Sequence, residues 1–368
     1  MKIGFDAKRL YNNFTGLGNH SRTTIDILTR YFPDNEYILY TPQIKDDPVV
    51  TTYLNKDHCS TIMPKGAVKG SAWRTLCMGH EASREGVELF HGLSNEIPLG
   101  LTVPSVVTIH DVAFRTFPDM YHWQDIKIYD MKWRYACKNA DRVIAISECT
   151  KRDIMRFYNV AEEKIDVVYQ PVSPIYYEMP KLPIRKSGAQ TYMLYVGSVN
   201  SRKNLLSVVK AMNILPRDLI LPLVVVGEGG EYKAAVERFV IENDLNDFVI
   251  FHASLNNQRE LQKLYHGATI FVYPSFYEGF GLPVVEAMLS GCPVLTSNVS
   301  SLPEAGGPYS IKADPASVED IAAKMHRMLI DEQLRNDIRQ QSFDYAMQTF
   351  HPKVLAGQLM EVYKKTIR

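Results

Sequence analysis

Short runs of apolar residues alternate along the chain with longer stretches in which apolar residues recur at helical spacing. A short apolar run bounded by turn residues fits a strand buried on both faces, and regular alternation of strands and helices is typical of parallel α/β folds. In the first half, strands are expected at residues 3–6, 37–40, 89–91, 106–110, 143–147 and 167–169. Helices are expected there at residues 18–31, 121–138 and 148–158.

The same pattern starts again in the second half of the chain. Strands are expected at residues 193–196, 223–226, 249–251, 270–273 and 294–297. Helices are expected at residues 202–215, 231–243, 258–266 and 283–290. From about residue 315 to 367 the periodicity is helical, which predicts three helices in series.

A proline-rich stretch without periodicity, residues 170–188, separates the two halves and is typical of an interdomain linker. A chain of 368 residues suggests two domains at roughly 150 residues each. The expected parts are a first domain at 1–172, a linker at 173–190, a second domain at 191–352 and a last helix at about 353–368 that packs back on the first domain. Both domains are predicted to be Rossmann-like, doubly wound α/β sheets that face a central cleft, with ligands beyond the carboxyl ends of the strands.

Composition excludes several classes of function. The 41 Lys and Arg residues balance the 41 Asp and Glu residues, and a net charge of zero argues against a nucleic-acid partner. The five cysteines form no Cys-x-x-Cys pair and no Asp-x-Asp follows a predicted strand, so neither a disulfide framework nor a metal site is expected. The most apolar segment, residues 219–226, is far shorter than a membrane span, and no leader is evident at the N-terminus, so we expect a cytoplasmic protein.

The most informative stretch follows the strand predicted at 270–273. It contains, in order, Glu278, Gly279, Gly281, Pro283 and Glu286. Glycines let the backbone approach a bulky anion, and the amides at the start of the following helix point toward it. Two acids beside a phosphate are useful only if they accept hydrogen bonds from neutral hydroxyls, as on a sugar. An acid pair alone is more often a solvated loop residue and a helix-surface charge, but the glycines and the proline favour a site.

Three further side chains follow predicted strands. Arg202 and Lys203 come after the strand at 193–196, where two cations at a helix start form a clamp for a diphosphate and stabilise a departing nucleotide. The alternative for them is a solvated helix start. His110 ends the strand at 106–110, where an imidazole can hydrogen-bond a sugar, although a lone histidine there is more often a packing residue.

The stretch at 273–288 resembles the E-x7-E signature of retaining, nucleotide-sugar-dependent glycosyltransferases of family 4, which have the GT-B architecture. The resemblance extends along nearly the whole chain. It includes residues 16–18, 110–111, 145–147, 197–204, 227–229 and 297–304. It therefore implies two Rossmann-like domains. The second, at 191–352, is expected to bind the nucleotide-sugar donor, and the first, at 1–172, is expected to be the acceptor side.

The resemblance also implies roles for individual residues. Glu286 is expected to accept the ribose hydroxyls, Glu278 to hold hydroxyls of the donor sugar, and His110 to lie beside the reacting carbon. Lys203 matches the family's diphosphate-binding lysine. Many members carry an arginine where this chain has Ser198, so neutralisation of the diphosphate is left to Lys203 and the neighbouring Arg202.

Other donor-binding positions are expected to act largely through their backbone. Ser254 and Leu255 match positions near the nucleobase. The amides of Gly279, Phe280, Gly281 and Leu282 are expected to stabilise the leaving diphosphate. Gly16 and Gly18 are predicted to form a flexible loop over a helix start that contacts the donor diphosphate or the acceptor, and a plain turn is the alternative.

Residues 197–204 and 297–304 resemble the mannosyltransferase branch that builds bacterial surface polysaccharides. We therefore expect metal-independent transfer of a hexose, mannose from GDP-mannose, to a hydroxyl of a glycan or lipid-linked acceptor, with no cofactor besides the GDP- or UDP-linked donor substrate. The alternatives are UDP-sugar-dependent glucosyl or N-acetylglucosaminyl transfer, a sugar-nucleotide 2-epimerase and a non-catalytic scaffold. The helix predicted at 121–138 is basic and aromatic. It fits an ordinary amphipathic helix with a solvated face, and the alternative is peripheral contact with an anionic membrane.

Overall fold

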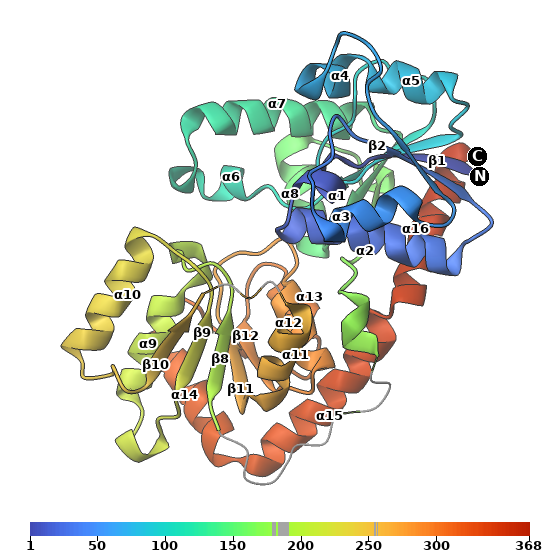
Figure 1. The fold of residues 1–368 in the computed structure, drawn as a ribbon. Coiled ribbons are helices and arrows are strands. Elements are labelled where there is room, and N and C mark those ends of the chain that lie inside the picture. Colours follow the sequence, from blue (N-terminus) through green and yellow to red (C-terminus); the bar gives the residue numbers. More distant parts are fainter. Residues whose placement is uncertain (179–181, 183–190, 254, 256) are drawn as a thin grey trace. The chain divides into compact units, whose positions relative to one another are not determined.

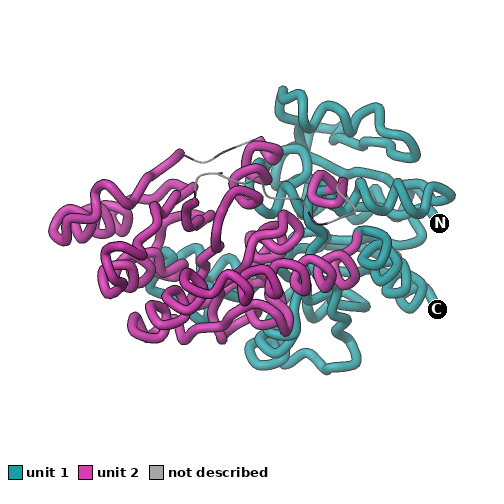
Figure 2. Tube along the Cα trace, turned by 90° about the horizontal axis from the view of Figure 1, so that it is seen from below, with its two compact units in different colours: residues 1–173, 352–368 teal, residues 174–351 magenta. Residues whose placement is uncertain are grey.

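The computed structural model describes residues 1–178, 182, 191–253, 255 and 257–368. The chain forms two compact units: unit 1 consists of residues 1–173 and 352–368, and unit 2 consists of residues 174–351 (Figure 2). Much of the segment expected as a linker, 173–190, lies outside the described residues, which omit 179–181 and 183–190.

In the described part of the chain, unit 1 is built on a seven-stranded parallel sheet with the order β3-β2-β1-β4-β5-β6-β7 (Figure 1). The strands are β1 (Lys2–Asp6), β2 (Glu36–Tyr40), β3 (Cys59–Ile62), β4 (Leu89–Gly92), β5 (Ser105–Ile109), β6 (Arg142–Ala145) and β7 (Ile165–Val167). The chain winds outward from β1 to β3 and then outward from β4 to β7. The direction of winding therefore changes between β1 and β4.

Side chains that alternate along the strands build a hydrophobic layer on each face of this sheet. Ile3 and Phe5 of β1 pack on the face covered by α2 (Gly16–Tyr31) and α16 (Pro352–Ile367). The opposite face is covered by α4 (Gly70–Leu76) and α5 (Met78–Arg84) over β2 and β4, and by α7 (Trp123–Asn139) over β5 and β6. Unit 1 also contains α1 (Lys8–Asn12), α3 (Pro48–Thr51), α6 (Ala113–Thr116) and α8 (Glu148–Tyr158).

The last helix, α16, is part of unit 1. The hydroxyl of its Tyr363 lies 2.7 Å from Nδ1 of the buried His91, and Thr108 Oγ1 lies 2.8 Å from Nε2 of the same ring. Because both nitrogens of this buried ring are satisfied, α16 is attached to β4 by a polar contact as well as by apolar packing.

Unit 2 repeats the architecture with a six-stranded parallel sheet in its described residues, in the order β10-β9-β8-β11-β12-β13. The strands are β8 (Met193–Val196), β9 (Leu223–Val226), β10 (Val249–His252), β11 (Ile270–Tyr273), β12 (Val294–Ser297) and β13 (Ile311–Ala313). The helices are α9 (Leu205–Ile214), α10 (Glu231–Glu242), α11 (Gln258–Gly267), α12 (Leu282–Leu289), α13 (Leu302–Gly306), α14 (Val318–Ile330) and α15 (Glu332–Thr349). Here the winding direction changes between β8 and β11.

Most predicted elements are confirmed, and several have the predicted ends. These are the strands at 193–196, 223–226, 270–273 and 294–297 and the helix at 148–158. The sequence pattern does not reveal β3 and β13, which are short strands at sheet edges. Since β3 reads Cys-Ser-Thr-Ile and is only partly buried, it lacks the apolar run by which the other strands are recognised.

Two local predictions are wrong. The helix expected at 202–215 starts later, because Ser201–Lys203 form a separate 3-10 turn and Asn204 adopts a left-handed conformation with φ of 62° before α9 begins. Gly16 and Gly18 do not form a loop, because both lie in the first turn of α2. A Cβ atom on Gly18 would come within 1.8 Å of the carbonyl oxygen of Asn13, so this glycine permits close packing rather than flexibility.

Candidate functional site

Unit 2 brings three charged side chains together at the point where its winding direction changes. Arg202 and Lys203 follow β8, and Glu278 follows β11, which is the neighbour of β8 in the sheet. Loops that leave adjacent parallel strands at such a switch point diverge, and the crevice between them is where α/β sheets bind ligands. The local topology therefore explains how residues about 75 positions apart in the sequence meet.

Glu278 is the centre of this group. Its Oε1 accepts hydrogen bonds from the Tyr273 hydroxyl at 2.8 Å and from Ser275 Oγ at 2.9 Å. Lys203 Nζ lies 3.2 Å from Oε1, and Arg202 Nη1 lies 3.2 Å from Oε2. Arg202 Nη1 also donates to the Tyr277 carbonyl oxygen.

The charges of the group do not cancel. Burial alone would raise the pKa of Glu278, but Lys203 and Arg202 outweigh burial and lower this pKa to about 2. Glu278 is therefore ionised at neutral pH. One carboxylate and two cations leave one net positive charge in a mostly buried setting. Such a group favours an anionic ligand.

Hydroxyl and amide groups fix the two loops that carry these charges. Ser300 Oγ donates to the Glu278 carbonyl oxygen at 2.8 Å and accepts from the Glu278 amide at 3.1 Å. Ser301 Oγ lies 2.8 Å from the carbonyl oxygens of both Glu278 and Phe280. Asn204, which is buried, donates to the Pro274 carbonyl oxygen at 3.1 Å and so joins one loop to the other.

The chain turns sharply before α12. Gly281 has φ of 111°, which a residue with a side chain rarely adopts, and a Cβ there would lie 2.7 Å from the Leu302 side chain. Leu282 is the first residue of α12, and Pro283 lies in its first turn. Gly279, Phe280, Gly281 and Leu282 thus form the approach to a helix N-terminus, as the sequence predicts.

Glu286 lies on α12 and has its own partner. Its Oε2 accepts a hydrogen bond from the buried Tyr265 hydroxyl of α11 at 3.1 Å. Burial raises the pKa of Glu286 to about 7, although the Tyr265 hydrogen bond acts in the opposite direction. The two acids of the motif therefore differ in charge. Glu278 lies beside two cations and is ionised, whereas Glu286 has no such cation among the causes of its pKa shift and is partly protonated near neutral pH.

His110 belongs to unit 1, directly after β5, and is buried. Its Nε2 lies 2.9 Å from the Leu93 carbonyl oxygen, which only accepts hydrogen bonds, so Nε2 carries the proton. Nδ1 therefore accepts from the side-chain amide of Gln170 at 2.7 Å. Burial lowers the pKa of His110, which keeps the ring neutral. The role of this ring beside a donor sugar stays a prediction.

The remaining predicted residues have simpler settings. Ser198 is exposed, and its hydroxyl accepts from Asn200 at 3.1 Å. Leu255 lies in the loop after β10, and Ser254 lies outside the described residues. Gly16 belongs to unit 1, where α2 begins. Within the described part of the chain, no group of three or more His, Cys, Asp or Glu residues is arranged to hold a metal ion.

Sequence reasoning missed the neutral residues that support the charged ones. Tyr273 and Ser275 hold the Glu278 carboxylate, Asn204 and Ser301 hold the loops, and Gln170 orients His110. For Tyr273 and Ser275 a signal was present, because Tyr273 ends the predicted strand at 270–273 and Ser275 lies just beyond it. Asn204, Ser301 and Gln170 act through hydrogen bonds to segments that are distant in sequence, which the local pattern does not reveal.

Comparisons with known proteins agree with this architecture. Residues 34–174 match the family model Glycosyltransferase Family 4, and residues 182–344 match Glycosyl transferases group 1. The chain is 31% identical to O-antigen chain mannosyltransferase B of Escherichia coli over 91% of this chain and 92% of that protein. It is 32% identical to O-antigen chain mannosyltransferase RfbU of Salmonella typhimurium over 52% of each chain. The solved structure of HepE from Anabaena in complex with UDP-glucose has a TM-score of 0.72 and 16% identity, covering 99% of this chain and 100% of that one.

Replacing Glu278 by glutamine is expected to lower the free energy of unfolding by about 3 kcal/mol, because it leaves two mostly buried cations without their counter-charge. Urea unfolding followed by circular dichroism measures the change. Glu242→Gln, at the exposed end of α10, is the matched control and is expected to have no effect. Equal stability of the two variants would contradict the central position assigned to Glu278.

Proposed function

Because the chain belongs to glycosyltransferase family 4, we propose that it transfers mannose from GDP-mannose to a hydroxyl of a glycan or lipid-linked acceptor, with retention and without a metal ion. The chain is a glycosyltransferase of two Rossmann-like units, the GT-B architecture. The observation that carries a nucleoside-diphosphate sugar as the donor is the positively charged group of Arg202, Lys203 and Glu278 at the switch point of unit 2. The names of the Escherichia coli and Salmonella relatives support mannose as the sugar and polysaccharide synthesis as the setting.

The proposed mechanism uses the charges of unit 2 at the leaving group. Arg202 and Lys203 would stabilise the negative charge that develops on GDP as the sugar departs, and fixed charges in a mostly buried site do this without reorganising. Glu278, already held by hydroxyl donors, would accept a hydroxyl of the sugar. Glu286 would accept the ribose hydroxyls. Positioning and leaving-group stabilisation then supply most of the acceleration.

Lys203→Ala is expected to lower kcat/KM for GDP-mannose about 100-fold, because it removes one of two cations at the leaving diphosphate. Lys263→Ala, an exposed lysine of α11, is the control and is expected to retain wild-type kinetics. The assay follows release of GDP in the presence of an acceptor glycan.

A panel of nucleotide sugars tests the donor in the same assay. Turnover with UDP-glucose or UDP-N-acetylglucosamine but not with GDP-mannose would refute the donor assignment. Conversion of the nucleotide sugar without any acceptor would instead identify an epimerase. A non-catalytic scaffold would be supported by two results together: no turnover with any donor, and a cellular phenotype that Lys203→Ala leaves unchanged.

Glu286 predicts a pH dependence for nucleotide binding. Its pKa of about 7 means that the ligand-free carboxyl is largely protonated at pH 6 and largely ionised at pH 8. Because the ionised form accepts hydroxyl hydrogen bonds better, GDP affinity is expected to rise between pH 6 and pH 8, by at most about tenfold over the whole interval, and to level off above it. Calorimetric titrations with GDP at several pH values measure this.

Glu286→Gln serves as the reference in those titrations, because it keeps an acceptor but cannot ionise. The difference between the two pH profiles isolates Glu286 from ionisation of GDP itself. Parallel profiles would show that Glu286 does not face the nucleotide.

We further propose that the protein works in the cytoplasm and that α7 contacts an anionic membrane. In this helix Trp123, Ile128 and Met131 are 63%, 46% and 65% exposed. Lys127 Nζ lies 4.6 Å from the centre of the Trp123 ring. Exposed apolar side chains beside exposed cations match an interface with anionic lipid. No helix in the described residues has the length and apolar character needed to cross a bilayer.

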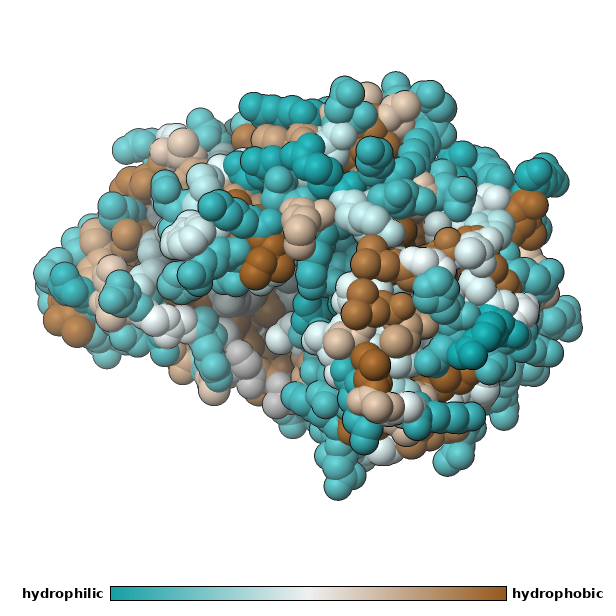
Figure 3. Space-filling view, turned by 90° about the horizontal axis from the view of Figure 1, so that it is seen from above, coloured by the Kyte–Doolittle hydropathy of each residue, from teal (hydrophilic) through white to brown (hydrophobic). Residues whose placement is uncertain are grey.

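Figure 3 views the molecule from above, the side on which Figure 1 draws α4, α5 and α7. Apolar side chains gather there in small clusters separated by polar ones. This mixed surface suits reversible contact rather than deep insertion.

Sedimentation with vesicles of phosphatidylglycerol and phosphatidylcholine tests the membrane contact. Trp123→Ala combined with Met131→Ser is expected to reduce binding several-fold, because it removes the most exposed apolar side chains of α7. Ile241→Ser replaces an equally exposed residue of unit 2 and is the control. Equal binding of both variants, or equal binding to vesicles of phosphatidylcholine alone, would contradict the proposal.

A further inference from the structure

Glu286 is held by the protein through only one of its two carboxylate oxygens. Its Oε2 accepts the hydrogen bond from the Tyr265 hydroxyl at 3.1 Å. Within the described residues, Oε1 has no hydrogen-bond partner and is not one of the enclosed polar atoms. Oε1 is therefore open to a ligand, whereas Oε2 is occupied by the side chain of a neighbouring helix.

Tyr265 acts on Glu286 from a fixed position. It lies on α11 and is fully buried. Its ring packs edge-to-face against Phe271 of β11, with 5.3 Å between the ring centres, and against Tyr176 at 6.4 Å. Tyr176 is also buried and belongs to the 3-10 turn Pro174–Tyr177. Because two aromatic neighbours fix the ring, its hydroxyl holds the carboxylate in one orientation.

Titratable side chains surround α12, the helix that carries Glu286, on several sides. They come from α11, α13, α15, β11 and the 3-10 turn, all of which pack against α12, whereas the adjacent β12 carries none. The groups that these elements place around α12 are Tyr265, His266, Glu304, Arg339, Tyr345, Tyr273 and Tyr176. Of these, only Tyr265 shifts the pKa of Glu286, and the other cause of the shift is burial.

Burial and the Tyr265 hydrogen bond have opposite effects on Glu286. Burial disfavours the charged carboxylate and raises the pKa, whereas a donor on Oε2 favours the charged form. The result is a pKa of about 7. Without the donor only burial would remain, so the pKa would rise further. The loss of one hydrogen bond to a charged group corresponds to a shift of about one pH unit.

We propose that Tyr265 is a positioning residue for nucleotide binding: its hydroxyl fixes Oε2 of Glu286, leaves Oε1 to the ribose of the donor and favours the ionised carboxylate. The identification of ribose as the group on Oε1 rests on the proposed function. The control of Glu286 by Tyr265 does not, because it follows from the hydrogen bond between the two side chains. One consequence is that nucleotide binding near neutral pH releases a proton from Glu286 to the buffer, because the ribose hydroxyls bind the ionised form.

Calorimetric titration with GDP in two buffers that differ in ionisation enthalpy counts the protons released on binding. Glu286→Gln provides the baseline, because its proton release comes from GDP and the other residues. Above this baseline the wild type is expected to release about half a proton at pH 7, since the pKa of Glu286 is about 7.

Tyr265→Phe keeps the buried ring and removes the hydroxyl. With the pKa of Glu286 about one unit higher, the variant is expected to release nearly a whole proton at pH 7 and to bind GDP about fivefold more weakly than the wild type. The two affinities are expected to converge by about pH 9, where Glu286 is ionised in both proteins. Tyr192→Phe is the matched control, because it removes a tyrosine hydroxyl that donates to the Leu264 carbonyl oxygen of the same helix. It is expected to match the wild type.

Two results for Tyr265→Phe would overturn the proposal: a pH midpoint equal to that of the wild type, or a loss of affinity that persists unchanged at pH 9. Circular dichroism confirms that each variant is folded. A carboxyl-carbon NMR titration of the wild type, assigned with Glu286→Gln, adds a test that needs no Tyr265 variant. Glu286 is expected to titrate near pH 7 in the free protein and to stay ionised in the GDP complex, and titration in the complex would contradict the proposal.

The measurements separate this proposal from the proposed function. Equal proton release by the wild type and Glu286→Gln would contradict the ribose contact of Glu286. The carboxyl titration of ligand-free Tyr265→Phe then still tests the effect of Tyr265 on the acid. A difference between the wild type and Glu286→Gln, without any difference between the wild type and Tyr265→Phe, would contradict the role of Tyr265 alone.

Discussion

The arrangement of unit 2 depends on one carboxylate that is held between two cations. The loops after β8 and β11 leave neighbouring parallel strands, and beyond the strand ends the sheet no longer holds them together. Glu278 makes the connection by bonding Arg202 and Lys203 of one loop while Tyr273 and Ser275 hold it from its own side. Desolvated charges in fixed positions are strong electrostatic groups, because no water screens them and no reorganisation is needed before they act. The ion pairs therefore join the two loops and leave a positive charge in a fixed position.

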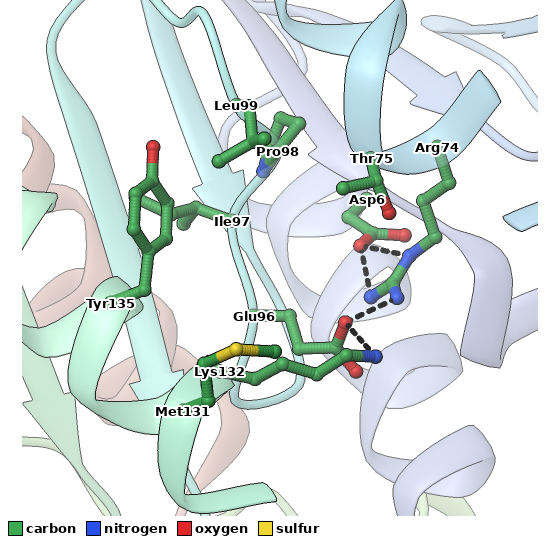
Figure 4. A pocket seen from close by; sticks show the side chains of 10 residues that line it. All are labelled: Asp6, Arg74, Thr75, Glu96, Ile97, Pro98, Leu99, Met131, Lys132 and Tyr135. Carbon is green, nitrogen blue, oxygen red and sulfur yellow. Dashed lines mark hydrogen bonds and ion pairs between the residues drawn. The ribbon is translucent and has the colours of Figure 1, made fainter. Parts of the chain in front are cut away.

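Unit 1 shows that the same topological position does not dictate the same set of charged side chains. Its sheet also changes winding direction at the centre, and a group of ion pairs again lies beyond the strand ends, on one side of a pocket of about 240 Å³ (Figure 4). In unit 1 one cation, Arg74, lies between two acids, Asp6 and Glu96, whereas in unit 2 one acid lies between two cations.

Sequence reasoning succeeded where information is local. Strands such as 223–226 are continuous apolar runs, and the acids, glycines and proline around Glu278 lie within one short stretch. It failed where the outcome depends on distant contacts. Gly18 is a packing glycine because Asn13 lies against it. Asn204 precedes α9 in a left-handed conformation, and its side chain donates to the carbonyl oxygens of Pro274 and Pro315. The pocket of unit 1 was also invisible, since its walls come from four separated segments with no motif.

The ion pairs of Glu278 also bear on how a diphosphate could enter. An arriving anion must draw Arg202 and Lys203 toward itself, and breaking a buried ion pair is normally costly. Here the carboxylate would keep two neutral donors, the Tyr273 hydroxyl and Ser275 Oγ, both on Oε1. The Tyr273 oxygen lies 2.5 Å from Lys203 Nζ, so this hydroxyl can accept from the lysine while it donates to the acid. The cations can therefore change partner without leaving Glu278 unsatisfied. In the proposed mechanism Oε2, released from Arg202, would be the atom that accepts a sugar hydroxyl.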